Sequence, residues 1–334
     1  MQIAPSPEAP LDVLGLGNAI VDVLAFSSEE LVRELGLVKG AMTLVDEERV
    51  EFLYRRMGPA REVSGGSCAN TMAALAALGG RPAYIGRVKD DELGRVFAHD
   101  IRAAGVTFHA KPAPNGPATA RCLIFVTPDA QRTMQTYLGA CVELGPEDVE
   151  PELVAAASIL YLEGYLWDRP EAKAACRKAI AIAHRHGRQV ALTLSDPFCV
   201  GRWREEFREL VEREVDILFA NEAEITALYE ASSFDEALQE VRRHVRFAAL
   251  TRGPKGSVVL RGEEVHVIDA APIDRLVDTT GAGDLYAAGF LYGLGRGFDL
   301  GACGRLGSLC AAEIIRQFGA RAERPLGPLL DRLR

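Results

Sequence analysis

The chain carries the stretch Asp278-Thr279-Thr280-Gly281-Ala282-Gly283-Asp284, followed by the apolar run Leu285-Tyr286-Ala287-Ala288-Gly289-Phe290-Leu291. Small residues at 281, 282 and 283 let backbone amides crowd around a phosphate, and the apolar run predicts a helix whose positive end points at the same place. The Asp284 carboxylate would repel a phosphate at rest, so it makes sense as a base that takes a proton from an attacking hydroxyl. We therefore predict a phosphotransferase, with an aspartate-capped glycine turn as the alternative.

The composition limits the kinds of partner and the compartment. The 334 residues suffice for two average domains or for one large α/β unit with a smaller appendage. The net charge of −9 argues against a nucleic-acid or anionic-membrane partner, because such binding surfaces are normally basic. No stretch approaches the ~20 apolar residues of a membrane span, and residues 1–10 lack the pattern of a secretion signal, so a cytoplasmic location is expected. Seven cysteines without a C-x-x-C pair favour reduced thiols over disulfides or structural zinc.

Apolar strand patterns alternate with helical patterns over most of the chain. Strands are predicted at 11–17, 84–88, 158–162, 189–194, 215–219 and 246–250, and helices at 70–78, 91–104, 146–156, 170–184, 202–212, 222–229, 283–294 and 299–317. Two hairpins are predicted, one from 118–126 and 132–138 and one from 256–260 and 264–268. The alternation predicts a parallel sheet with helices on both faces, and a site beyond the carboxyl ends of its strands.

A second small-residue stretch lies near the N-terminus, Ser64-Gly65-Gly66-Ser67-Cys68-Ala69-Asn70-Thr71, and an alanine-rich helix pattern follows it. Together with the stretch at 278–284, it resembles the two signatures of the ribokinase-like (PfkB) carbohydrate and nucleoside kinases, from about residue 11 to about residue 319. The resemblance implies one ribokinase-like domain over 1–334: a three-layer α/β/α core with a mostly parallel central sheet, and a small β-sheet lid drawn from about 21–46 and 107–139. It also implies ATP and Mg²⁺, and it allows K⁺ near the loop at Asp278.

The segment that follows the strand at 215–219 resembles the family's N-x-x-E element, which organises magnesium around ATP phosphates. Asn221 and Glu224 are the matching residues, and they would act on the metal through water, because magnesium prefers oxygen ligands and keeps waters. An Asn N-cap with acidic residues in the first helical turn is the alternative interpretation, and it needs no metal.

The loop after the strand at 246–250 resembles the nucleotide-binding T-x-G-x-x-G element of the family. Thr251, Gly253 and Gly256 match it, Thr279 is assigned to the same nucleotide, and the adenine would lie between this loop and the final helix near Ala311. A tight turn into a hairpin describes the loop equally well. The G-x-x-x-x-G-K-[ST] pattern of a P-loop is absent.

The acceptor side is predicted around the end of the first strand. Asn18 and Asp22 would hydrogen-bond adjacent ribose hydroxyls, as an early Asn/Asp pair does in this family; a turn-forming Asn and an exposed strand Asp are the alternative. Gly65, Gly66 and Asn70 would admit sugar hydroxyls close to the backbone, or the glycines simply allow close packing of the helix.

Three features bear on which acceptor is used. Ser67 stands where ribokinases carry a lysine, which counts against free ribose. The segments 192–198 and 215–224 are more similar to those of the adenosine kinases, although Asp196 replaces the small residue usual there. Ile20 occupies the last glycine position of G-x-G-x-x-G, so a dinucleotide-binding dehydrogenase is improbable. Arg132, in the predicted lid, would either reach the transferring phosphate or lie on a solvated strand.

The resemblance therefore implies ATP-dependent phosphorylation of the 5′-hydroxyl of a nucleoside, adenosine to AMP, by a monomer or homodimer. Asp284 would be the general base, and the backbone amides of Gly281, Ala282 and Gly283 would stabilise the charge of the transferring group. A sugar or phosphosugar kinase of the same family is one alternative. A catalytically silent nucleoside sensor on the same fold is another.

Overall fold

The computed structural model describes residues 10–129 and 131–333. Residues 1–9, which carry most of the segment compared with a secretion signal, lie outside them. Every helix in the described part of the chain is too short or too polar to cross a bilayer. The seven cysteines are unpaired and buried, as the spacing of the cysteines predicted.

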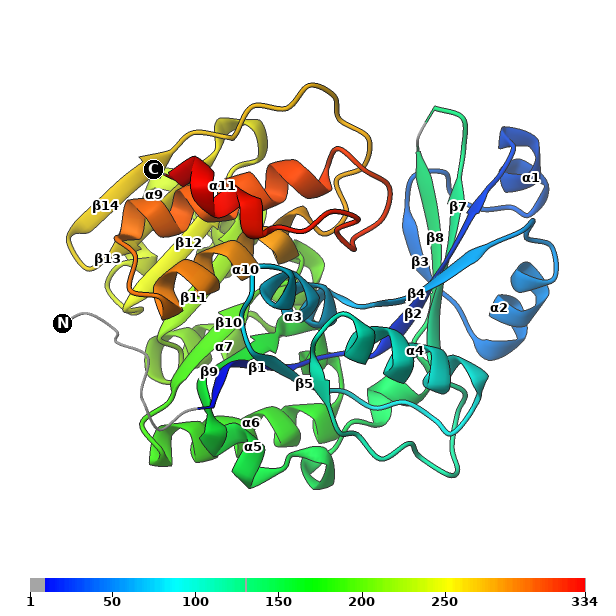
Figure 1. Cartoon of the computed structure of the whole chain (residues 1–334), viewed down its shortest axis with the longest axis horizontal. Coiled ribbons are helices and arrows are strands. Elements are labelled where there is room, and N and C mark those ends of the chain that lie inside the picture. The colour runs from blue at the N-terminus through cyan, green and yellow to red at the C-terminus, as the bar shows by residue number, and fades with distance from the viewer. Residues whose placement is uncertain (1–9, 130, 334) are drawn as a thin grey trace.

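Within residues 10–129 and 131–333, the larger of two sheets has nine strands in the order β14-β13-β12-β11-β10-β9-β1-β5-β6 (Figure 1). Their bounds are β1 (Leu11–Leu16), β5 (Pro82–Ile85), β6 (Thr107–Phe108), β9 (Ala157–Glu163), β10 (Gln189–Thr193), β11 (Ile217–Asn221), β12 (Phe247–Thr251), β13 (Ser257–Arg261) and β14 (Glu264–Ile268). All neighbours from β6 to β12 pair in parallel, and only β13 and β14 run antiparallel. The carboxyl ends of seven parallel strands therefore converge on one edge, which confirms the predicted parallel core.

Helices cover both faces of this sheet, which confirms the three-layer α/β/α class (Figure 1). One layer holds α3 (Ser67–Ala77), α4 (Glu92–Ala103), α10 (Ala282–Gly295) and α11 (Leu300–Ile314); the other holds α5 (Pro151–Ala156), α6 (Pro170–Arg185), α7 (Pro197–Arg213), α8 (Glu222–Tyr229) and α9 (Phe234–Val241). Alternate residues of a strand enter opposite cores. In β9, Tyr161 packs against the layer that contains α3 and α10, and Leu160 packs against the layer that contains α6 and α7, because successive side chains of a strand point to opposite faces.

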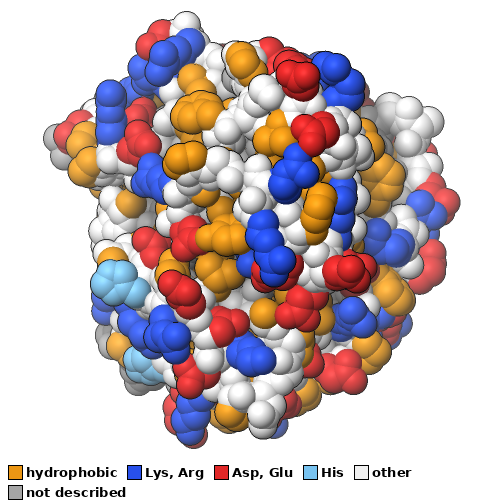
Figure 2. Space-filling model, turned by 90° about the vertical axis from the view of Figure 1, so that its right-hand side faces the viewer, with side chains coloured by type: hydrophobic (Ala, Val, Ile, Leu, Met, Phe, Trp, Pro, Cys, Tyr) orange, Lys and Arg blue, Asp and Glu red, His pale blue; other side chains and the backbone are white. Residues whose placement is uncertain are grey.

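The smaller sheet has five strands in the order β3-β8-β7-β2-β4. They are β2 (Ile20–Phe26), β3 (Met42–Leu44), β4 (Arg61–Gly65), β7 (Ala120–Val126) and β8 (Arg132–Tyr137), and the helices α1 (Glu29–Glu34) and α2 (Glu47–Tyr54) pack on one face. The sheet takes in β4, which lies outside the two ranges expected for the lid, whereas Thr107–Phe108 pairs in the larger sheet. Figure 2 shows the side of the molecule that carries the smaller sheet, where basic and acidic side chains are interspersed.

Several element boundaries differ from the predicted ones for local reasons. The helix predicted at 146–156 is a 3₁₀ turn, Pro146–Asp148, followed by α5, because Pro151 cannot donate to a continuing helix and suits a first turn. Helix α7 begins five residues before its predicted start, since the Asp196 side chain accepts a hydrogen bond from Cys199 N at 2.7 Å and caps it. The helices α1, α2 and α9 are short and were not predicted.

Phe290 packs helix α10, which contains Asp284, against the larger sheet. It is fully buried in α10, and its ring lies 5.5 Å from that of Phe219 on β11 at an interplanar angle of 87°. Phe290→Ala should lower the free energy of unfolding by about 3–5 kcal/mol, because it leaves a cavity between α10 and the sheet. Denaturant unfolding measures this loss. Phe198→Ala, at a side chain that is 79% exposed, is the control and should change stability by less than about 0.5 kcal/mol; equal losses would contradict this packing.

Candidate active site

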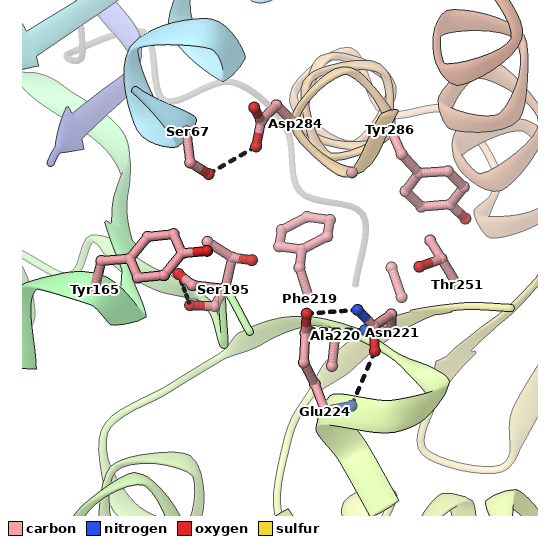
Figure 3. Close-up of a pocket in the computed structure, with 13 residues that line it drawn as sticks. Ser67, Tyr165, Ser195, Phe219, Ala220, Asn221, Glu224, Thr251, Asp284 and Tyr286 are labelled. Atoms are coloured by element: carbon pink, nitrogen blue, oxygen red, sulfur yellow. Dashed lines mark hydrogen bonds between the residues drawn. The ribbon is translucent and has the colours of Figure 1, made fainter. Parts of the chain in front are cut away.

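Three cavities follow one another along the carboxyl ends of the parallel strands. The inter-sheet cavity, of about 360 Å³, lies between the smaller sheet and the core and contains Asn18 and Asp22 in its wall. The central cavity, of about 330 Å³, is drawn in Figure 3 and contains Asn221 and Glu224. The apolar cavity, of about 490 Å³, contains Ala311.

Shared wall residues make these cavities continuous. Ser67, Tyr165 and Asp284 line both the inter-sheet and the central cavity. Thr251 and Gly283 line both the central and the apolar cavity. Asp284 therefore lies at the junction where a group bound in the inter-sheet cavity would meet a group reaching in from the apolar cavity.

Two side chains of α3 hold the Asp284 carboxylate. Ser67 Oγ donates to Asp284 Oδ1 at 2.7 Å, and Asn70 Nδ2 donates to Asp284 Oδ2 at 2.9 Å (Figure 3 shows the first bond). Burial raises the pKa of Asp284, while these two hydrogen bonds and Arg321 lower it. The Asn70 Oδ1 atom is buried and has no partner among the described residues, which leaves one acceptor for a bound hydroxyl.

The start of α10 has the backbone geometry of an anion cradle. Gly281 is the N-cap with a φ of 74°, and a Cβ there would lie 2.9 Å from Ala320 Cβ. Glycine is needed at this position for both reasons. A Cβ on Gly283 would meet nothing within 4 Å, so the backbone beside Asp284 is open to the cavities, and Ala282 and Thr279 line the apolar cavity next to it. Ala282 N donates to Thr279 O at 3.2 Å, and the positive end of the helix at this first turn would attract a phosphate.

The structure brings Asn18 and Asp22 into the inter-sheet cavity, together with Gly66 and Asn70. Burial raises the pKa of Asp22 to about 6, against the lowering effect of nearby arginines. Gly65 is not in the cavity wall: a Cβ there would meet the Asp22 carboxylate at 2.5 Å. A Cβ on Gly66, whose φ is 91°, would meet Asn18 O at 2.2 Å. The two glycines thus let Asp22 of β2 and Asn18 of the loop after β1 approach the junction of β4 and α3, so the close packing at these glycines involves a strand and a loop and not the helix that the alternative named.

Asn221 and Glu224 form a reciprocal capping box at the start of α8. Glu224 N donates to Asn221 Oδ1 at 2.9 Å, Asn221 N donates to Glu224 Oε2 at 2.9 Å, and Asn221 Nδ2 donates to Glu224 Oε1 at 2.6 Å. The capping interpretation therefore describes the local structure. Both residues also line the central cavity (Figure 3), and burial raises the pKa of Glu224 to about 7. A carboxylate placed there would attract a hydrated divalent cation.

The apolar cavity suits a flat uncharged ring. Its wall contains Thr251, Gly253, Gly256 and Thr279 from the predicted nucleotide segments, and none of its lining residues is charged. Gly256 has a φ of 82°, and a Cβ there would lie 1.9 Å from Ile268 O, so this glycine is required by the turn into β13. The loop is a tight turn and also a wall of the cavity.

Four residues of the site were not selected from the sequence. Glu163 ends β9, is 1% exposed, and accepts from Asn18 N at 2.8 Å and from Cys68 N at 2.9 Å. Burial raises its pKa to about 7. Ser195 lines the central cavity with a φ of 72°, and Tyr165 lines two cavities. Glu163 could have been selected from the sequence, because it is an acidic residue at the end of an apolar strand. The fourth residue is Ser67, and apart from the small-residue motif nothing in the sequence indicated that it would contact Asp284.

Arg132 is not on a solvated strand. Its Nε atom lies 3.0 Å from Asp278 Oδ1, and the two side chains are 11% and 1% exposed. Asp278 also accepts from Thr280 N at 2.8 Å and from Gly319 N at 3.0 Å. The charge of this carboxylate is thus balanced by Arg132, and the K⁺ that the resemblance allowed near this loop stays a prediction.

The fold and the connected cavities define a kinase of sugars or nucleosides. A family model described as pfkB family carbohydrate kinase matches residues 53–326. The chain therefore belongs to the pfkB family of carbohydrate kinases, and the ribokinase-like fold expected from the sequence is confirmed. Kinases of this family use ATP with a divalent metal.

Individual relatives differ in their acceptors. The crystal structure of adenosine kinase from Sinorhizobium meliloti is 54% identical, has a TM-score of 0.91, and the match covers 98% of this chain and 100% of that one. That of a "probable sugar kinase protein" from Rhizobium etli CFN 42 is 50% identical, with a TM-score of 0.91, over 97% and 98%. An ATP-dependent ribose-1-phosphate kinase from Halopiger xanaduensis is 34% identical over 69% of this chain and 73% of its own length.

Glu224→Gln separates the metal role of this residue from its capping role. A glutamine can still complete the capping box but has no charge, so the fold should persist and the magnesium concentration for half-maximal rate should rise several-fold. Because the pKa of Glu224 is about 7, the wild-type protein should need more magnesium as the pH falls below 7, and the variant should lack this dependence. Glu236→Gln removes a first-turn glutamate of α9 outside the three cavities and is the control. Unchanged magnesium titrations in Glu224→Gln would leave only the capping role.

Proposed function

We propose that the protein transfers the γ-phosphoryl group of ATP to the 5′-hydroxyl of a nucleoside, with adenosine as the preferred acceptor. The observation that carries this proposal is the position of Asp284 in the wall shared by the inter-sheet and central cavities, next to Gly283, which also lines the apolar cavity. The uncharged apolar cavity is suited to the adenine of ATP, and the inter-sheet cavity is suited to the acceptor.

The chemistry assigned to each residue follows from this arrangement. Asp284 takes the proton of the attacking hydroxyl, while Ser67 and Asn70 keep its carboxylate pointed at the junction. The backbone amides of Gly281, Ala282 and Gly283, at the positive end of α10, stabilise the charge of the transferring group. Asn221 and Glu224 are the residues that would organise the magnesium ion, which neutralises phosphate charge when bound. Closure of the smaller sheet over the acceptor would exclude water.

The acceptor cavity is lined by both polar and apolar side chains, which favours a nucleoside over a free sugar. Its polar side chains include Asn18, Asp22, Asn70 and Asp284. Its apolar wall includes Ile20, Met42, Leu44, Ile124, Met134 and Phe198. A free sugar has only hydroxyl groups to offer to this wall, whereas a nucleobase would bury apolar surface against it. The 54% identity to the Sinorhizobium meliloti adenosine kinase supports the same acceptor.

A phosphosugar is the second candidate, because two arginines line the inter-sheet cavity. Arg202 is already paired with Asp168, at 3.0 Å and 2.8 Å, which leaves Arg169 as the available cation. The 34% identity to a ribose-1-phosphate kinase supports this candidate. The same wall also contains five carboxylates, Asp22, Glu163, Asp168, Asp196 and Asp284, which would repel a second phosphate. A neutral acceptor therefore fits better, and a silent sensor would have no use for the hydrogen bonds that orient Asp284.

Asp284→Asn tests the base. The amide cannot take a proton but keeps the size of the side chain, so turnover should fall by about 10²–10⁴ while ATP binding, measured by calorimetry, stays unchanged. Thermal unfolding of the variant should match the wild type. Turnover close to the wild-type value would remove Asp284 from the role of base.

The acceptor is tested by measuring phosphate transfer from radiolabelled ATP to adenosine, 2′-deoxyadenosine, ribose and ribose 1-phosphate. Adenosine should give the highest kcat/KM. Asp22→Ala should lower it at least about tenfold, since an unpaired buried hydroxyl costs about 1–3 kcal/mol. Loss of the 2′-hydroxyl should be penalised in the wild type and much less in the variant, because both changes delete one contact. Additive losses would mean that Asp22 does not contact the ribose, and preference for ribose 1-phosphate would favour the second candidate.

A further inference from the structure

The segment that follows α11, residues 315–323, contacts both halves of the site. Val277 N and Asp278 N donate to Ile315 O at 2.8 Å and 3.2 Å, and Gly319 N donates to the Asp278 carboxylate. Ala320 packs against Gly281, the N-cap of α10. The segment is thereby attached to the loop that leads into the helix of Asp284.

Arg321 extends from this segment to the other half of the site. Its Nε donates to Ser64 O at 2.8 Å, one Nη donates to Ala69 O at 2.6 Å, and the other donates to Ser64 Oγ at 2.9 Å. Ser64 lies near the end of β4, and Ala69 lies in the first turn of α3. Asp100 of α4 accepts from Ser64 N at 2.7 Å and from Ser64 Oγ at 2.6 Å.

The residues between these anchors are Gly65, Gly66, Ser67 and Cys68, and Asn70 follows Ala69 directly. Two consecutive glycines restrict the backbone little, so the direction in which α3 begins must be set by contacts from outside the segment. Arg321 supplies three such contacts, and its planar guanidinium holds the two carbonyl groups in fixed relative positions. Ser67 and Asn70, which hydrogen-bond the two Asp284 oxygens, are placed by this arrangement.

We propose that Arg321 is a positioning residue of the phosphoryl-transfer site: it clamps the end of β4 to the first turn of α3, so that Ser67 and Asn70 meet the Asp284 carboxylate, and it places a permanent positive charge behind that carboxylate. This inference rests on the proposed function only in that Asp284 is the base. It does not depend on which acceptor is used.

The charge of Arg321 favours the ionised form of Asp284. The positive charge of Arg321 lowers the pKa of Asp284 and of Asp22, against burial, which raises both. Asp22, Asp100 and Tyr84 also act on Arg321. Other titratable groups on four elements also interact electrostatically with Asp284. They are Asp22, Cys68, Tyr161, Glu163 and Tyr165. Loss of the Arg321 charge raises the pKa of Asp284, so the base is ionised only at higher pH.

The test compares Arg321→Gln and Arg321→Lys in the full-length protein. The pH profile of kcat/KM is measured with whichever acceptor the wild type phosphorylates best. Arg321→Gln should move the acidic limb to higher pH, so its activity relative to wild type should be several-fold lower at the acidic end than on the plateau. Arg321→Lys keeps the charge and should leave the limb in place while lowering kcat, because lysine cannot make the three directed bonds. The ATP dissociation constant should stay within about twofold, since Arg321 does not line the apolar cavity.

Arg324→Gln is the matched control: it removes the same charge from an exposed position three residues further along the chain and should leave the profile unchanged. An unmoved limb in Arg321→Gln, or equal limbs and equal kcat values in all three variants, would overturn the inference. If the wild type phosphorylates no acceptor at all, the proposed function fails separately. The pKa of Asp284 is then compared between wild type and Arg321→Gln by ¹³C titration of labelled aspartates, assigned with Asp284→Asn, and an unchanged value would again overturn the inference.

Discussion

The hydrogen bonds from Ser67 and Asn70 to Asp284 join residues more than 200 positions apart in the chain, and the geometry of the site depends on them. They attach the start of α3 to the start of α10, so the two small-residue stretches become one surface. Neither stretch could orient the carboxylate alone, because a partly buried carboxylate needs donors on both oxygens to stay fixed. The parallel sheet makes the meeting possible, since it brings the carboxyl ends of its strands to one edge.

Glycines allow these parts to approach more closely than any other residue would. Gly65 leaves room for the Asp22 carboxylate, Gly66 for the carbonyl of Asn18, and Gly281 for Ala320. In each case the neighbour is another part of the protein rather than open space. Gly283 is the exception, since a side chain there would meet nothing and would project beside Asp284. The glycines of the two signatures thus serve close packing at three positions and an open cradle at one.

The site is acidic although its proposed phosphate donor is an anion, and local positive groups have to compensate. Burial raises the pKa values of Asp22 to about 6 and of Glu163 and Glu224 to about 7, which reduces the negative charge that these groups carry near neutral pH. Arg132 neutralises Asp278, and Arg321 and the N-terminal end of α10 add positive potential. This balance agrees with the net charge of −9, because in the proposed reaction local groups, and not an overall basic surface, would hold the anion.

Local sequence patterns were sufficient for the class of fold and for the segments that build the site. Apolar periodicity, turn residues and two small-residue signatures act over a few positions, so they predicted the parallel core and the start of α10 to within one residue, but placed the start of α3 three residues too late. The role of Asp284 as a base stays a prediction. Short helices such as α1, α2 and α9 could not be predicted in this way, because each contains too few residues to show a helical periodicity of apolar side chains. Tertiary structure alone decided which side chains hold Asp284, that Glu163 lies against Asn18, that β4 joins the smaller sheet, and that Arg321 bridges Ser64 and Ala69. These contacts join residues far apart in the chain, and no local pattern records which distant atoms meet when separate elements pack.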